Sequence, residues 1–99
     1  MESEQISVVE LDGEGKLHIV PAKEEFQYVY REAMEVSWDI QRKSLHSPVP
    51  REWSYARWFQ QIIAAALAQG AQLQLHTGTI WINVPDELRE ELEQLGTAA

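Results

Sequence analysis

Residues 72–88 read QLQLHTGTIWINVPDEL, and they indicate the architecture more clearly than any other stretch. Apolar and polar residues alternate over 72–76 and again over 79–84, which is the period-two pattern of half-buried β-strands. Thr77 and Gly78 stand between the two runs and suit a two-residue hairpin turn. The stretch therefore predicts a β-hairpin that leads into a helix.

The register of this hairpin predicts which side chains are buried. A two-residue turn pairs Leu75 with Ile80 and Leu73 with Ile82, so these four side chains share one face. The opposite face then carries Gln72, Gln74, His76, Thr79, Trp81 and Asn83.

The chain turns from strand to helix at Val84-Pro85. Proline suits the first helical turn because its missing N–H is not needed there, and acids in that turn complement the helix dipole. Residues 86–95 fit a short helix, and Gly96 suits the position that follows it. Val-Pro pairs at 20–21 and 49–50 have similar surroundings. We therefore expect a unit of two strands and a helix three times.

The first unit has two apolar runs, 6–11 and 16–20, around a turn-rich loop. A helix is expected from about Ala22, because a stripe with helical spacing follows. This stripe consists of Phe26, Val29, Tyr30, Ala33 and Met34.

Residues 35–47 allow two interpretations. Either the first helix continues to Lys43, or this segment forms a second hairpin. The alternation of Val36, Trp38 and Ile40 with polar residues favours the hairpin.

Residues 51–69 form the next predicted helix, and Gly70 follows its end. The whole chain, 1–99, is thus expected to be a single α+β domain with a mainly antiparallel sheet built from β-hairpins. Two to three helices would pack on one face, in the order ββα-ββα-ββα. Residues 1–5 are expected to be disordered and residues 96–99 to form a frayed tail.

Composition narrows the classes of function. The chain has 99 residues, 16 acidic and 8 basic side chains, a net charge of −8 and no cysteine. Disulfide scaffolds and cysteine zinc sites are therefore excluded, and nucleic-acid binding is disfavoured because phosphates need a basic surface. No signal peptide is recognisable, and no apolar run approaches the roughly 20 residues of a membrane span. We expect a cytoplasmic protein that binds neither nucleic acid nor membrane.

Charge is unevenly distributed along the chain. Residues 1–14 carry five acids and no base, and residues 86–99 carry five acids against Arg89. Residues 58–85, by contrast, carry no charged side chain when His76 is neutral. Exposed surfaces normally carry charges, so this stretch predicts burial on more than one side, which a second subunit would supply. We therefore expect a homodimer.

The sequence has no catalytic motif that we recognise. His18, His46 and His76 are 28 and 30 residues apart and have no metal-ligand spacing. No catalytic residue, metal site or cofactor is predicted, and an enzyme is disfavoured without being excluded.

Four tryptophans are many for a chain of this size, and aromatic residues build cores as well as interfaces. We predict that Trp53, Trp58 and Trp81, with Gln74, form a binding interface. A ligand pocket between hairpin and helix is the alternative. Its mouth would carry Trp38, Asp39, His46 and Arg51.

Two runs of sequence, residues 26–39 and 50–59, resemble segments of small uncharacterised bacterial proteins. Some proteins of that kind are carried on the mobile gene cassettes of integrons. The resemblance implies a bacterial origin and carries no shared activity and no site residue.

Three hypotheses of function follow. The first is a non-enzymatic protein–protein interaction domain that acts as a homodimer through residues 58–85. The second is a small-molecule-binding domain or enzyme with an aromatic pocket. The third is an acidic antagonist of the antitoxin or immunity type, which would use its acidic ends against a basic partner.

Overall fold

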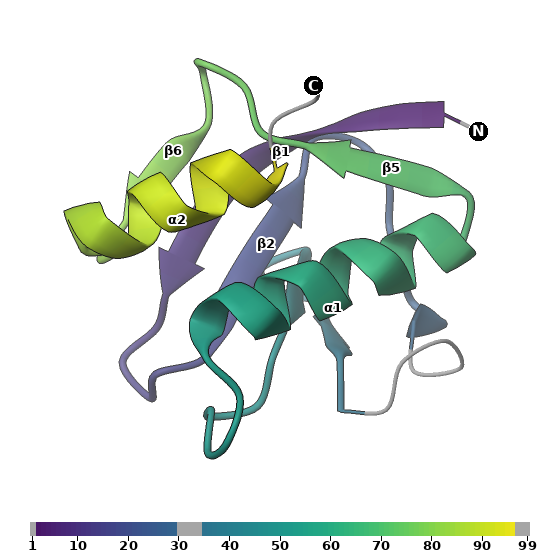
Figure 1. Ribbon diagram of the computed structural model, residues 1–99. Helices are drawn as coiled ribbons and strands as arrows, with labels where there is room; N and C mark the ends of the chain where they lie inside the picture. Colours follow the sequence, from purple (N-terminus) through teal and green to yellow (C-terminus); the bar gives the residue numbers. More distant parts are fainter. Residues whose placement is uncertain (1, 30–34, 97–99) are drawn as a thin grey trace.

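The computed structural model describes residues 2–29 and 35–96 (Figure 1). Its elements follow the order β1 (Glu2–Leu11), β2 (Leu17–Pro21), β3 (Ser37–Asp39), β4 (Ser44–His46), α1 (Tyr55–Ala68), β5 (Ala71–Gln74), β6 (Ile80–Ile82) and α2 (Asp86–Gly96). The six strands form one sheet in the order β3-β4-β2-β1, with β5 and β6 both on the far edge of β1. The β1–β2, β2–β4 and β3–β4 pairs are antiparallel, whereas β5 and β6 run parallel to β1.

Both helices lie on the same face of this sheet (Figure 1). Phe59 and Ile62 of α1 and Leu92 of α2 are fully buried there. They belong to one core together with Val9 of β1 and Ile19 of β2. The α+β class is therefore confirmed. The sheet is mixed, and two helices are found in the described residues where two to three were expected.

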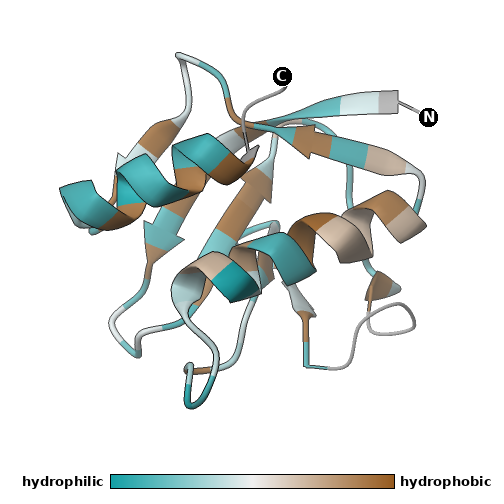
Figure 2. Ribbon diagram, viewed as in Figure 1, coloured by the Kyte–Doolittle hydropathy of each residue, from teal (hydrophilic) through white to brown (hydrophobic). Residues whose placement is uncertain are grey.

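Helix α1 begins later than the predicted residue 51. The Ser54 side chain accepts a hydrogen bond from the Arg57 N–H, so Ser54 is the N-cap and residues 51–53 stay outside the helix. At the other end Gly70 adopts a φ of 96°, which a residue with a side chain rarely adopts. The C-terminal half of α1 is largely apolar (Figure 2), but it is not buried on every side, since Leu67 is 40% exposed.

The hairpin predicted over residues 72–84 is wrong. β5 pairs with residues 2–5 of β1, and β6 pairs with residues 8–10 of the same strand, both in parallel. The two segments are thus halves of one interrupted edge strand, and residues 75–79 form the interruption. The ten-residue β1 is long enough to offer main-chain partners to both halves.

This pairing reverses the predicted faces of β6. Trp81 is paired with the buried Val9 and packs against the core, and the Arg89 guanidinium of α2 lies 5.2 Å from the centre of its ring. Because side chains alternate along a strand, Ile80 and Ile82 face away from the helices. They are 57% and 38% exposed, respectively.

The first predicted helix is also wrong over its described part, because residues 22–29 contain no α-helix. The buried Glu4 carboxylate of β1 accepts the N–H groups of Lys23 and Glu24 at 2.6 and 2.5 Å, which holds this segment in a turn. Phe26 and Val29 are buried as the stripe predicted. The rest of that prediction, residues 30–34, lies outside the described residues.

The second hairpin is present, since β3 and β4 pair antiparallel with Trp38 opposite Leu45. Its turn places Lys43 at a φ of 55°. A β-hairpin followed by a helix is therefore found only for the second of the three predicted units, within the described residues. The third unit has the order β5, β6, α2 but no hairpin, and residues 22–29 of the first unit contain no α-helix. Residues 2–5, which we expected to be disordered, belong to β1, and residues 97–99 of the expected frayed tail lie outside the described part. None of the helices in that part is long and apolar enough to cross a membrane.

Candidate functional site

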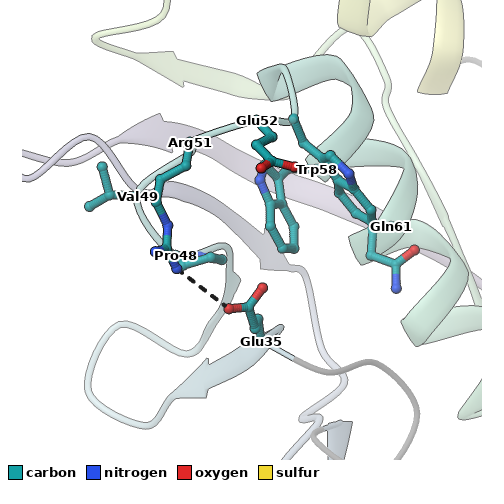
Figure 3. A pocket seen from close by; sticks show the side chains of 8 residues that line it. Glu35, Pro48, Val49, Arg51, Glu52, Trp58 and Gln61 are labelled. Carbon is teal, nitrogen blue, oxygen red and sulfur yellow. Dashed lines mark ion pairs between the residues drawn. The ribbon is translucent and has the colours of Figure 1, made fainter.

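A cavity of about 440 Å³ lies between the segment that precedes α1, the first two turns of α1, and Glu35 on the chain before β3. Figure 3 shows the labelled side chains around it, with Glu35 reaching toward Arg51. The lining residues are Glu35, Pro48, Val49, Arg51, Glu52, Trp53, Trp58 and Gln61.

Two tryptophans form the aromatic part of the wall. The rings of Trp53 and Trp58 are 4.8 Å apart between centroids, with 46° between their planes. The Arg57 guanidinium lies 4.3 Å from the centroid of the Trp53 ring, so Trp53 is held between a cation and a second ring. These contacts limit the freedom of Trp53, which comes from a segment without regular structure.

Trp58 carries the polar group that distinguishes the cavity. This residue is 6% exposed, and its Nε1 is buried without a hydrogen-bond partner in the described structure. A buried donor left unpaired costs about 1–3 kcal/mol. Trp58 also lines the cavity, so the unpaired N–H belongs to a residue of the cavity wall.

Charged side chains surround the opening. Arg51 and Glu35 approach to 4.0 Å, and their side chains are 84% and 52% exposed. An exposed ion pair of this length contributes little to stability and can be exchanged for other partners. Glu35 also has a φ of 73°, a conformation that costs most residues about 1 kcal/mol. The charged side chains at the opening can therefore exchange partners, whereas the two tryptophan rings are held by their mutual contact.

The structure does not bring the four predicted pocket residues together. Only Arg51 lines the cavity. Trp38 packs against the core with its ring 6.0 Å from that of Phe26. The Asp39 carboxylate accepts two N–H groups in the β3–β4 turn, which lowers its pKa even though burial raises it. His46 lies on β4 and donates from Nδ1 to the carbonyl of the residue that follows it.

The four predicted interface residues divide into two groups. Trp53 and Trp58 line the cavity. Trp81 is partly buried on β6 against α2, and Gln74 is half-buried at the end of β5. Trp53 and Trp58 were predicted as interface residues and not as pocket residues, and nothing in their spacing indicated Glu35, which lies far from them in the sequence.

A second cluster, Asp12, His18 and Ser44, was not predicted. His18 Nε2 is 2.7 Å from Asp12 Oδ2, and its Nδ1 is 2.8 Å from Ser44 Oγ. These residue types also form hydrolase triads, but Ser44 and His18 are 0% and 2% exposed, so no substrate could reach the hydroxyl. The cluster ties the β1–β2 turn to β2 and β4.

The carboxyl of Asp12 in this cluster has a lowered pKa. Burial raises the pKa of its carboxyl, but hydrogen bonds from the Lys16 N–H, from His18 and from the Glu14 N–H outweigh it and lower the pKa to about 2. The charged form is therefore stabilised in the folded chain. In the described residues no group of three or more potential metal ligands is found.

Comparison with known proteins supports the resemblance seen in the sequence. The family model of the integron cassette protein Hfx_Cass5 matches residues 4–79. A solved structure, the integron cassette protein Hfx_Cass5 from the mobile metagenome of North West Arm Sewage Outfall, is 55% identical. The match covers 99% of each chain, with a TM-score of 0.51. No curated protein matches. The chain belongs to the Hfx_Cass5 family of integron cassette proteins.

Proposed function

We propose that this protein is a small-molecule-binding domain and that its ligand occupies the cavity beside Trp53 and Trp58. The observation that carries the proposal is the buried Nε1–H of Trp58, which has no partner in the described structure and lies on a residue of the cavity wall. Pockets for small ligands combine apolar walls with a few polar groups that orient the ligand. This cavity has that composition.

The lining indicates the chemistry of the ligand. Aromatic and aliphatic walls from Trp53 and Pro48 favour a flat apolar body, and the Trp58 N–H requires a hydrogen-bond acceptor on it. The exposed charges of Arg51 and Glu35 favour a polar end at the opening. The volume of about 440 Å³ is within the usual range for small ligands, so a single-ring compound with a carbonyl acceptor suits it.

The indole resonances of ¹⁵N-labelled protein provide the test. Benzamide and benzoate serve as probes, because they share a ring and an acceptor but differ in charge. We expect a saturable shift of the Trp58 indole N–H, and we expect Trp58→Phe to abolish binding by removing the donor while keeping an aromatic ring.

Trp38→Phe is the matched control. The Nε1 of Trp38 is also buried and without a partner in the described structure, but Trp38 does not line the cavity. Binding should therefore survive this substitution. Equal loss in both variants, or a titration in which the Trp58 resonance does not move with either probe, would contradict the proposal.

A further inference from the structure

We propose that the ligand of the cavity carries a positive charge, in the form of a protonated amine at the end that lies at the opening. This inference rests on the proposed function and deepens it, because it names the charge class of the ligand. The ring of the ligand packs against Trp53 and Trp58, and its ammonium group binds the carboxylate of Glu52, with Glu35 as a second acceptor.

The first support is the balance of charge in the wall. Glu35 and Glu52 both line the cavity, and Arg51 is the one basic residue among the described residues that line it. Arg51 lies 4.0 Å from Glu35, whereas Glu52 has no hydrogen-bond or ion-pair partner in the part of the chain that the structure describes. An ammonium group would give the Glu52 carboxylate an opposite charge at close range.

The second support is the position of Arg51, which does not make this an anion site. Its side chain is 84% exposed and already near Glu35, so its charge is screened by solvent and partly balanced. An anionic ligand would have to separate Arg51 from Glu35, and it would then share the cavity with two carboxylates. The net charge of −8 on the chain adds a longer-range potential that repels anions and attracts cations.

The third support is the aromatic wall, which is compatible with a cation. The Arg57 guanidinium lies 4.3 Å from the centroid of the Trp53 ring, so one indole of the wall already attracts a positive group within the chain. Arg57 is not among the lining residues, and it therefore leaves the carboxylates of the cavity to the ligand. Trp58, at 4.8 Å from Trp53, extends the aromatic surface on which the ring of the ligand would pack.

Three probes separate the charge classes. Benzamide is neutral, benzoate is anionic, and para-aminomethylbenzamide adds a protonated amine to the ring of benzamide. Titration of ¹⁵N-labelled protein, followed by the indole resonances, gives a dissociation constant for each probe. We expect the cationic probe to bind about threefold more tightly than benzamide, which is the size of an exposed ion-pair contribution, and benzoate to bind more weakly than benzamide. Added salt should reduce the advantage of the cationic probe.

Two substitutions at the opening should act in opposite directions. Glu52→Gln should weaken the cationic probe by about threefold, and more than it weakens benzamide. Arg51→Gln should strengthen the cationic probe, because it removes a competing cation and releases Glu35. Glu91→Gln is the matched control, since it removes the same charge from an exposed residue of α2 that does not line the cavity. Its effect on the dissociation constant should be much smaller than that of Glu52→Gln.

The outcomes distinguish this inference from the proposed function. Equal affinity for benzamide and the cationic probe, tighter binding of benzoate than of benzamide, or equal effects of Glu52→Gln and Glu91→Gln would overturn the inference. These results would leave the proposed function intact, because benzamide would still bind. If none of the three probes moves the indole resonances, the proposed function is wrong and the inference fails with it.

Discussion

The hydroxyl of Thr79 donates a hydrogen bond of 2.7 Å to the main-chain carbonyl of Ile6. Thr79 also accepts the N–H of His76 at 3.1 Å, so one side chain closes the interruption and attaches it to β1. The register of β1 against β2 shifts between Ile6 and Val8, at the same level of the sheet. The irregularities on the two sides of β1 are therefore joined by a single buried threonine.

We predict that Thr79→Val destabilises the protein. The Ile6 carbonyl would lose its buried donor, and the free energy of unfolding should fall by about 1–3 kcal/mol. Urea denaturation measures the change. Thr79→Ser keeps the hydroxyl and should recover most of it. Thr77→Val, the same change at an exposed position, should have an effect within about 0.5 kcal/mol; equal losses at 77 and 79 would count against this explanation.

Stability should decrease in acid because of Asp12. Its folded pKa of about 2 lies below the ordinary value of 3.8, so the charged carboxylate stabilises the fold above the unfolded pKa. This contribution is lost as the pH falls from about 3.8 to about 2. Its size is on the order of 2 kcal/mol.

Asp12→Asn tests this contribution. The variant should be less stable at neutral pH and should show a weaker loss of stability across the acid range, measured by urea denaturation at several pH values. Glu14→Gln, on a side chain that is 75% exposed, provides the control and should keep the wild-type profile. An unchanged acid profile in Asp12→Asn would contradict the assignment.

The end of α1 depends on a glycine. Gly70 has a φ of 96°, and a Cβ added there would meet no atom within 4 Å. Backbone strain alone should therefore make Gly70→Ala destabilising, by about 1 kcal/mol. Thermal unfolding provides the measurement. Gly13→Ala, where the space is also open and φ is not positive, should have a much smaller effect; similar losses at both glycines would show that strain is not the cause.

Several features of the fold could be predicted because they depend on neighbours in the sequence. The β3–β4 hairpin follows from the alternation around Trp38, and α1 follows from its apolar stripe and Gly70. The N-cap at Ser54 could also have been recognised, since serine is among the preferred residues there.

The differences between the predicted and the observed elements have causes that are distant in the sequence. The segment expected to form a helix from Ala22 is instead attached to β1, since the Lys23 N–H donates to the carboxylate of Glu4, 19 residues earlier. The hairpin expected at Thr77 and Gly78 competes with β1, more than 70 residues earlier, as the Thr79–Ile6 hydrogen bond shows. Periodicity does not identify which strand provides a partner, because it describes one face of one segment.

The candidate site likewise has features that the sequence suggests and features that depend on packing. Residue type marked Trp53, Trp58 and Arg51 as binding residues, because aromatic and arginine side chains favour contacts with other molecules. Their assembly with Glu35 into one cavity, and the exclusion of Trp38 and His46 from it, depends on how the segments pack.

The sequence by itself therefore determined the α+β class, the helix α1 and the second hairpin. Tertiary packing decided the partner of each strand, the face on which Trp81 lies and the location of the cavity. The physical reason is the range of the interactions. Helical and hairpin patterns are encoded within a few residues, whereas strand pairing and burial are settled by competition among segments far apart in the chain.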